Sequence, residues 1–226
     1  AFVSAAWTGS VTVTITDGDG DTASASADIS NQIGFEDDGP NAHSVTASKI
    51  LDDEAQSLFP PNPGAVSGDV SPDLNTVSGN AGTLFNSGVD GTQSVTFTPP
   101  SGLKAIYDNG GVAAQETLHY TTTTSSGHTI LTAIGDTSGN TVFTLSVGND
   151  GSYTFTVDEP LVHPTHSTTE ENISLNIGFT VTDGDGDQDA GSLTVNVNDD
   201  TPTISGVTQF GSELIVNGSF EGGHSD

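Results

Sequence analysis

Apolar and polar residues alternate along most of the chain with a period of two. The runs place β-branched, Leu or aromatic residues at one position and mostly Thr or Ser at the next, and they lie at 11–16, 143–147, 153–157, 175–181 and 193–197. This alternation is typical of half-buried antiparallel strands, whereas the 3.6-residue period of amphipathic helices is nearly absent. The sequence therefore predicts an all-β protein whose unit is an antiparallel, Ig-like or Greek-key β-sandwich.

Turn residues punctuate these runs. Gly148-Asn149-Asp150-Gly151 predicts a hairpin that joins 142–147 to 152–157. The stretch from 59 to 80 is rich in Pro, Gly and Ser and has little periodicity, so we expect a long surface loop or weak strands there.

The chain contains an internal repeat. Val13-Thr-Ile-Thr-Asp-Gly-Asp-Gly-Asp21 matches Phe179-Thr-Val-Thr-Asp-Gly-Asp-Gly-Asp187, and Asp37-Asp-Gly-Pro40 matches Asp199-Asp-Thr-Pro202. The spacing gives a unit of about 160 residues. The Pro after each acidic pair is expected to stiffen a boundary between units.

The repeat divides the chain into three predicted parts. Residues 1–36 are the C-terminal strands of a preceding repeat, 37–200 form one complete β-sandwich repeat, and 201–226 start the following domain. The chain has no Met, even at residue 1, so we expect it to be an internal fragment of a longer protein.

The charge excludes several partners. Two Lys and no Arg face 30 carboxylates, and the formal net charge is −28. Such a chain cannot neutralise nucleic acid phosphates or bind an anionic membrane surface, and its acids repel one another unless cations neutralise them. A salt-adapted surface of solvated acids is the alternative, but clustering of the acids favours bound multivalent cations. No apolar run approaches the ~18 residues of a membrane span, so we expect no membrane insertion.

Two acidic loops are the sharpest chemical signal. Residues 17–21 and 183–189 lie between alternating runs, so each is predicted to be a hairpin loop, with Gly residues that allow the curl. Carboxylates at alternate positions suit calcium (Ca2+), which takes hard oxygen ligands in a flexible cage. The EF-hand pattern fails, because Thr22 and Gln188 occupy its Gly position. A solvated Asp-Gly turn is the alternative.

A second acidic set lies at the predicted boundaries, at 36–38 and 198–200. If the strand after the 183–189 loop is the last of the sandwich, that loop shares one pole with the incoming linker, and calcium there would join consecutive units. A plain acidic linker is the alternative. A third cluster at 52–54 is either a solvated turn or a ligand group. The predicted metal ligands are Asp17, Asp19, Asp21, Asp37, Asp38, Asp183, Asp185, Asp187, Asp189, Asp199 and Asp200.

Catalytic patterns are absent from the sequence. There is no GxSxG or HExxH motif, and no Cys is available as a nucleophile, a disulfide partner or a thiolate ligand. His163 and His166 flank a Pro, which argues against a helix that presents both to zinc, so we expect them at the surface. We therefore predict that the chain is not an enzyme.

Several segments together resemble the large calcium-dependent extender repeats of giant RTX adhesins, which Gram-negative bacteria export by type I secretion. The segments are 51–54 (LDDE), 79–85 (GNAGTLF), 150–156 (DGSYTFT), 160–164 (PLVHP), 178–187 (GFTVTDGDGD), 192–197 (SLTVNV) and 199–202 (DDTP). They cover most of the chain from 41 to 202.

The resemblance implies a secreted, extracellular protein at the cell surface of a Gram-negative bacterium. Its repeats would act as extenders in attachment and biofilm formation, with calcium at the domain ends. The partners implied are neighbouring repeats in the same chain, and host or biofilm surface ligands bound through other domains. The alternative is a sugar- or peptide-binding module, or a scaffold beside one, in the same adhesin.

One segment departs from the repeat pattern. Residues 215–221 (IVNGSFE) resemble the opening strand of carbohydrate-binding jelly-roll modules. We therefore expect a ligand-binding domain to begin there.

Overall fold

A computed structural model describes residues 8–30, 32, 37–56, 58, 66–165 and 169–201. Within these residues the chain forms fourteen strands and one 3-10 turn, η1 (Asp53–Ala55). The strands are β1 (Ser10–Thr16), β2 (Thr22–Asp28), β3 (Asn41–Ala42), β4 (Ser44–Asp52), β5 (Thr76–Gly79), β6 (Phe85–Asn86), β7 (Thr92–Thr98), β8 (Lys104–Asp108), β9 (Ala113–Ser125), β10 (His128–Gly135), β11 (Thr141–Gly148), β12 (Tyr153–Val157), β13 (Asn172–Asp183) and β14 (Gln188–Asn198).

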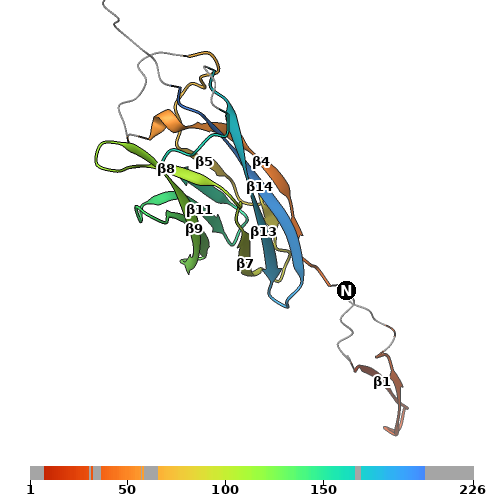
Figure 1. Cartoon of the computed structure of the whole chain (residues 1–226). Coiled ribbons are helices and arrows are strands. Elements are labelled where there is room, and N and C mark those ends of the chain that lie inside the picture. The colour runs from red at the N-terminus through yellow and green to blue at the C-terminus, as the bar shows by residue number, and fades with distance from the viewer. Residues whose placement is uncertain are drawn as a thin grey trace, which may run out of the picture.

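Two sheets pack face to face and form a sandwich (Figure 1). One has six strands in the order β5-β12-β11-β10-β9-β8, and the other has four in the order β4-β14-β13-β7. The short strands β3 and β6 form a separate pair. The predicted all-β sandwich is confirmed.

The core lies between the two sheets and follows the alternation of the sequence. On β11, Phe143, Leu145 and Val147 are fully buried, while the Thr and Ser between them are half-buried on the opposite face. The four-stranded sheet contributes its own inward rows, including Ile177 and Val195. Since successive side chains of a strand point to opposite faces, each strand needs only one apolar row to close the core.

Several local predictions can be compared with the strands. The hairpin around 148–151 is confirmed, since β11 and β12 pair antiparallel across it. The stretch from 59 to 80, whose described part begins at 66, contains one short strand, β5, at the edge of the larger sheet. One pairing departs from the antiparallel pattern, because β14 pairs parallel with β4.

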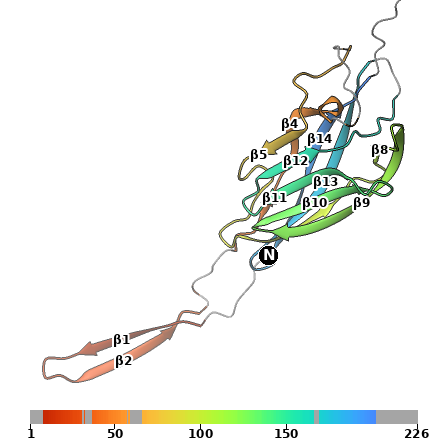
Figure 2. The ribbon, with the colours of Figure 1, turned by 90° about the vertical axis from the view of Figure 1, so that its left-hand side faces the viewer.

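The first two strands form a two-stranded sheet of their own. The pairing of β1 with β2 runs without a bulge from Ser10↔Asp28 to Thr16↔Thr22 (Figure 2). All its residues are exposed, including Val13 at 59% and Ile15 at 67%. By the internal repeat it corresponds to the turn end of the β13–β14 hairpin, whose apolar rows are buried in the sandwich. Its assignment to a preceding repeat remains a prediction.

Several features named from the sequence lie outside the described residues. These are Glu36 of the boundary set, His166, Pro202, and the following domain beyond 201 with its 215–221 segment.

Candidate cation sites at the two poles of the sandwich

The sandwich has two ends, which we call the entry pole and the exit pole. The entry pole holds Asp37 and Asp38, the 86–92 segment and the β13–β14 turn, at the lower end in Figure 1. The exit pole holds the end of β4, η1, the 66–73 segment and residues 198–201, at the opposite end. Each pole gathers carboxylates from segments that are far apart in the sequence.

The β13–β14 turn of the entry pole is organised by Asp183. Its backbone N–H donates to the Asp187 carbonyl at 3.0 Å, and its Oδ1 accepts from the N–H groups of Gly186 and Asp187 at 3.0 and 2.8 Å. Gly186 has a φ of +107°, which an L side chain rarely adopts. Asp183 is fully buried, and its Oδ2 has no hydrogen bond. One carboxylate thus shapes the loop and keeps an unsatisfied oxygen.

Three further carboxylates converge beside this turn. Asp37, Asp90 and Asp185 each offer an oxygen within 4.8 Å of the others, and all three are exposed. The pKa of Asp185 is raised to about 6, first by the adjacent carboxyl of Asp183, then by loss of water and by the charge of Asp37. The linker and the last hairpin loop therefore meet at one pole, as the topology argument expects. Asp90 was missed because a lone acid in a turn carries no spacing signal.

Two other predicted ligands at the entry pole accept hydrogen bonds from backbone N–H groups. Asp38 Oδ2 accepts from Val89 N at 3.0 Å, and Asp189 Oδ2 accepts from Ala42 N at 2.8 Å. The pKa of Asp189 is lowered by its bonds to Ala42 and then Ala190. Asp38 thus joins the linker to the 86–92 segment, and Asp189 joins β14 to β3.

The β1–β2 turn has the same backbone pattern as the β13–β14 turn. Asp17 N–H donates to Asp21 O at 2.9 Å, and Asp17 Oδ1 accepts from the N–H of Asp19, Gly20 and Asp21 at 3.3, 3.2 and 3.0 Å. Asp17, Asp19 and Asp21 bring oxygens within 4.8 Å of one another, and all are exposed.

At the exit pole, Asp199 lies beside a buried pair. His163 Nε2 lies 3.2 Å from Asp53 Oδ2 and 4.0 Å from Asp199 Oδ1. Burial lowers the pKa of His163, but the hydrogen bond and charge of Asp53 outweigh it, and the pKa is raised. The surface position expected for His163 is wrong, since only 5% of the residue is exposed. The sequence pattern could not show that the 161–163 segment folds onto η1.

The remaining exit-pole acids form two groups that share Glu54. Asp200 lies with Glu54 and Glu170, while Asp52 lies with Glu54, Asp69 and Asp73, again within 4.8 Å. Burial and neighbouring negative charge raise the pKa of Glu54 and of Glu170 to about 7. The cluster at 52–54 therefore belongs to a larger acidic group that sequence reasoning did not find.

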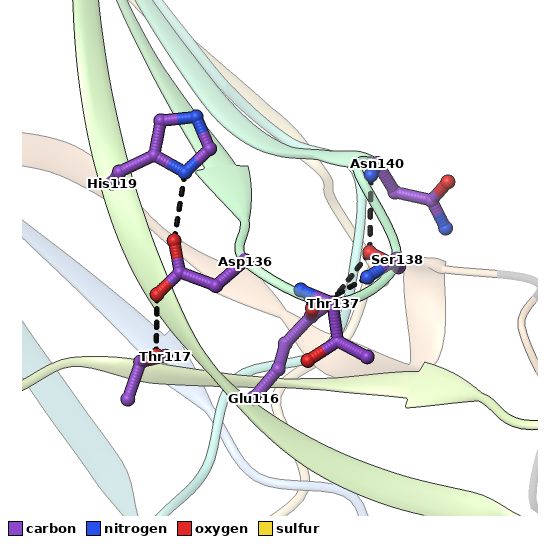
Figure 3. Close-up of polar contacts among 7 residues, drawn as sticks. All are labelled: Glu116, Thr117, His119, Asp136, Thr137, Ser138 and Asn140. Carbon is purple, nitrogen blue, oxygen red and sulfur yellow. Dashed lines mark hydrogen bonds and ion pairs between the residues drawn. The ribbon is translucent and has the colours of Figure 1, made fainter.

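A separate polar network holds the β10–β11 turn (Figure 3). Glu116, on β9, is buried and accepts from Thr137 N, Ser138 N and Ser138 Oγ at 2.7, 2.9 and 2.6 Å. Nearby, His119 Nδ1 lies 2.8 Å from Asp136 Oδ1, and Thr117 donates to the other oxygen of Asp136. Glu116 thus ties the turn to the neighbouring strand.

Replacing Glu116 with Ala should lower the free energy of unfolding by about 1–3 kcal/mol, because it removes the charged acceptor of three hydrogen bonds from Thr137 and Ser138. Burial raises the pKa of Glu116, but its hydrogen bonds to Ser138 and Thr137 outweigh this, so the pKa lies below its ordinary value of 4.5. The parent should therefore hold this stabilisation above pH 4.5 and lose it as the pH falls through the lowered pKa. Denaturant unfolding at several pH values measures both effects.

Glu116→Gln serves as the matched control, since it keeps one acceptor and cannot ionise. It should lose less stability than Glu116→Ala and show a flatter acid dependence than the parent. Equal acid dependence of parent and Glu116→Gln would contradict the role given to this carboxylate.

One cavity of about 340 Å³ opens at the β8 edge of the sandwich. It is lined by 100–104, 162, 164 and 173–175, where β8 of one sheet faces β13 of the other. Lys104, one of the two lysines, lies on its wall.

The fold and the poles define an all-β sandwich with carboxylate groups at both ends. The chain belongs to the family described as a domain of unknown function (DUF5801), whose model matches residues 50–196. No curated protein and no solved structure matches the chain. Among the described residues, no helix has the length and apolar character needed to cross a membrane.

Proposed function

We propose that this chain is a calcium-rigidified structural extender of a bacterial surface adhesin that takes part in attachment and biofilm formation. One observation carries the proposal: carboxylates converge at both poles of the sandwich, and each pole includes a fully buried Asp with an oxygen that has no hydrogen bond, Asp183 at one and Asp52 at the other. Buried, unpaired carboxylates are costly, and a hard divalent cation relieves that cost.

The position of the groups supports a mechanical role. A cation between Asp37, Asp90 and Asp185 joins the incoming linker to two loops of the sandwich. It removes the freedom of the linker to bend at the point where a preceding unit would attach. An extender transmits force along its length, so a rigid junction suits it. Secretion, the Gram-negative cell surface and the adhesin context are supported by the sequence resemblance.

The partners in this account are neighbouring repeats of the same chain. Ligands on host or biofilm surfaces would be bound by other domains. We propose no catalytic role. The carboxylates that converge at the poles are proposed to bind cations, and the polar groups of the turns hold the backbone.

A sugar- or peptide-binding module is the second candidate, and the cavity at the β8 edge is the observation that favours it. Its lining of 100–104 and 173–175 offers Pro, Leu, Ile and Ser side chains beside one Lys. Binding of the isolated chain on a glycan or peptide array, lost on Leu103→Asp, would support this candidate over the extender.

A tandem protein tests the extender proposal. Residues 37–198 are joined to a second copy of 37–200, because 199–200 corresponds to 37–38 in the repeat. Asp183→Asn with Asp185→Asn in the second copy weakens the cage at the junction. We expect a shorter maximum dimension in small-angle X-ray scattering with calcium, close to that of the parent in EGTA.

The same two substitutions in the first copy are the matched control. That entry pole joins no other repeat, so the composition and charge change equally while the junction stays intact. The control should remain as extended as the parent. Equal dimensions for both variants and the parent, unaffected by EGTA, would contradict a calcium-locked junction.

A further inference from the structure

We propose that residues 119–125, at the open edge of β9, pair antiparallel with the same residues of a second copy of this chain. The six-stranded sheet of one copy would then continue into that of the other across a two-fold axis. This edge contains none of the carboxylates that converge at the poles, so the proposal goes beyond the calcium-dependent extender role and does not rest on it.

The second half of β9 has a partner strand on one side only. β8 pairs with 113–117, whereas β10 pairs with 118–125. Among the described residues, no strand pairs with the other edge of 119–125, so this part of β9 is a margin of the larger sheet (Figure 2). Residues 121–125 are all exposed, although they belong to a regular strand.

The ladder shows which backbone groups face the open edge. The register between β9 and β10 is continuous, and Asp136 N–H donates to Thr117 O at 2.9 Å, so the odd-numbered residues of β9 bond to β10. The N–H and C=O groups of Tyr120, Thr122 and Thr124 therefore point away from β10. A row of unpaired backbone groups of this kind is a template for another strand.

The other edges of the two sheets have features that oppose strand pairing. β5 has only four residues, and β8 is covered by the 160–162 segment, since Ile106 N–H donates to Pro160 O at 2.8 Å. β4 carries the exposed Lys49 at an irregularity of its pairing, and β7 runs into two prolines. Residues 119–125 have no Lys, no Pro and no bulge. This edge therefore lacks the usual protection against another chain.

The charge distribution favours a second copy as the partner. The chain has 30 carboxylates, but residues 117–149 contain only one, Asp136. That carboxylate is held by its neighbours, because His119 Nδ1 lies 2.8 Å from its Oδ1 and Thr117 donates to its other oxygen. Two copies with a net charge of −28 each repel one another over most of their surface. A neutral strand edge is where they can approach.

The residues of this edge are complementary to themselves. A two-fold axis at Thr122 pairs the whole of 119–125, with Thr122 opposite its own copy, Thr121 opposite Thr123, and Tyr120 opposite Thr124 of the second copy. Both open edges are used in this arrangement, so it closes as a dimer and does not grow into a fibre.

Hydroxyl pairs across strands would add to the backbone hydrogen bonds. Thr and Ser side chains that face one another on an antiparallel pair stabilise it. The chain contains such contacts elsewhere, since Thr12 Oγ1 lies 2.7 Å from Ser26 Oγ and Thr76 Oγ1 lies 3.1 Å from Thr156 Oγ1. The run of Thr from 121 to 124 offers the same chemistry to a second copy.

Sedimentation equilibrium of the 226-residue chain tests the proposal, with CaCl2 in every sample. The mean mass should rise from 22.9 kDa toward twice that value as the protein concentration increases from micromolar to millimolar. Thr122→Lys places a charge at the open edge and should weaken self-association roughly tenfold or more. The added positive charge lowers the net repulsion between copies, so a general charge effect would strengthen association instead.

Thr154→Lys is the matched control. Thr154 is exposed on β12, which has a neighbouring strand on each side, so the same change of charge is made away from any edge. This variant should associate as the parent does. A parent that stays monomeric at every concentration, even if it binds an extended peptide, would overturn the proposal, and so would equal association of Thr122→Lys and the parent.

A cross-linking variant keeps the test informative if Thr122→Lys fails to fold. The chain has no Cys, so Thr122→Cys introduces a single thiol. Opposed residues of a hydrogen-bonded antiparallel pair have Cα atoms about 5.5 Å apart, within the disulfide range of about 4.4–6.8 Å. Mild oxidation should give a disulfide-linked dimer of Thr122→Cys and little of Thr154→Cys. Equal cross-linking of the two variants would contradict pairing at this edge, and the extender proposal would still stand.

Discussion

Chelation of calcium should lower the melting temperature of this protein by roughly 10–20 °C. An ion that binds only the folded state stabilises it by about 2.7 kcal/mol at a hundredfold excess over its dissociation constant. Two ions, one at each pole, therefore stabilise the folded state by about 5 kcal/mol together. For a chain of this size each kcal/mol shifts the melting temperature by roughly 2–4 °C. Calorimetric scans in CaCl2 and in EGTA measure the difference.

Ionic screening must be separated from specific binding, since a net charge of −28 responds to any salt. NaCl at matched ionic strength, and MgCl2 at matched concentration, should each recover only a small part of the loss. Superimposable melting curves in CaCl2 and EGTA would contradict the claim that calcium stabilises the fold.

Truncation of a core phenylalanine should have the second large effect. Phe143 and Phe155 are fully buried on adjacent strands with ring centroids 5.1 Å apart, and Phe143 also lies 6.1 Å from the Tyr120 ring. Phe143→Ala removes these contacts and leaves a cavity, which typically costs about 3–5 kcal/mol. Denaturant unfolding in saturating calcium measures the loss.

Thr144→Ala is the matched control, because Thr144 is the next residue on β11 and faces away from the core. It should change the free energy of unfolding by less than about 1 kcal/mol. The loss caused by Phe143→Ala should be similar in calcium and in EGTA, since distant, independent sites contribute additively. A Phe143→Ala protein within about 1 kcal/mol of the parent would contradict the assignment of the core.

The alternation of the sequence predicted the sandwich because each strand encodes its own buried row. Phe143, Leu145 and Val147 face the core as their period requires, and the turn at 148–151 places β12 beside β11. The parallel pairing of β4 with β14 was not predictable in this way. A period of two fixes which face a residue occupies and carries no information on which strand lies beside it, or in which direction.

The residues of the candidate sites also differ in whether the sequence could predict them. Asp183, Asp185 and Asp37 were found because spacing and topology are local properties of a hairpin and its linker. Asp69, Asp90 and Glu170 are single acids in turns or beside a strand, and only the folding of distant segments brings them to the poles. For Glu54 the sequence leaves a solvated turn and a ligand role equally open, because its neighbours in space lie far away in sequence.

Crystals of the chain grown with calcium would show whether ions are bound at the two poles. Anomalous difference maps collected at long wavelength locate the ions without reference to the protein density. We expect one peak among Asp37, Asp90 and Asp185 and one among Asp52, Glu54, Asp69 and Asp73, with oxygens at about 2.3–2.6 Å. Maps that show no peak at either pole at calcium concentrations well above ~1 mM, the range bound by extracellular modules, would contradict this expectation.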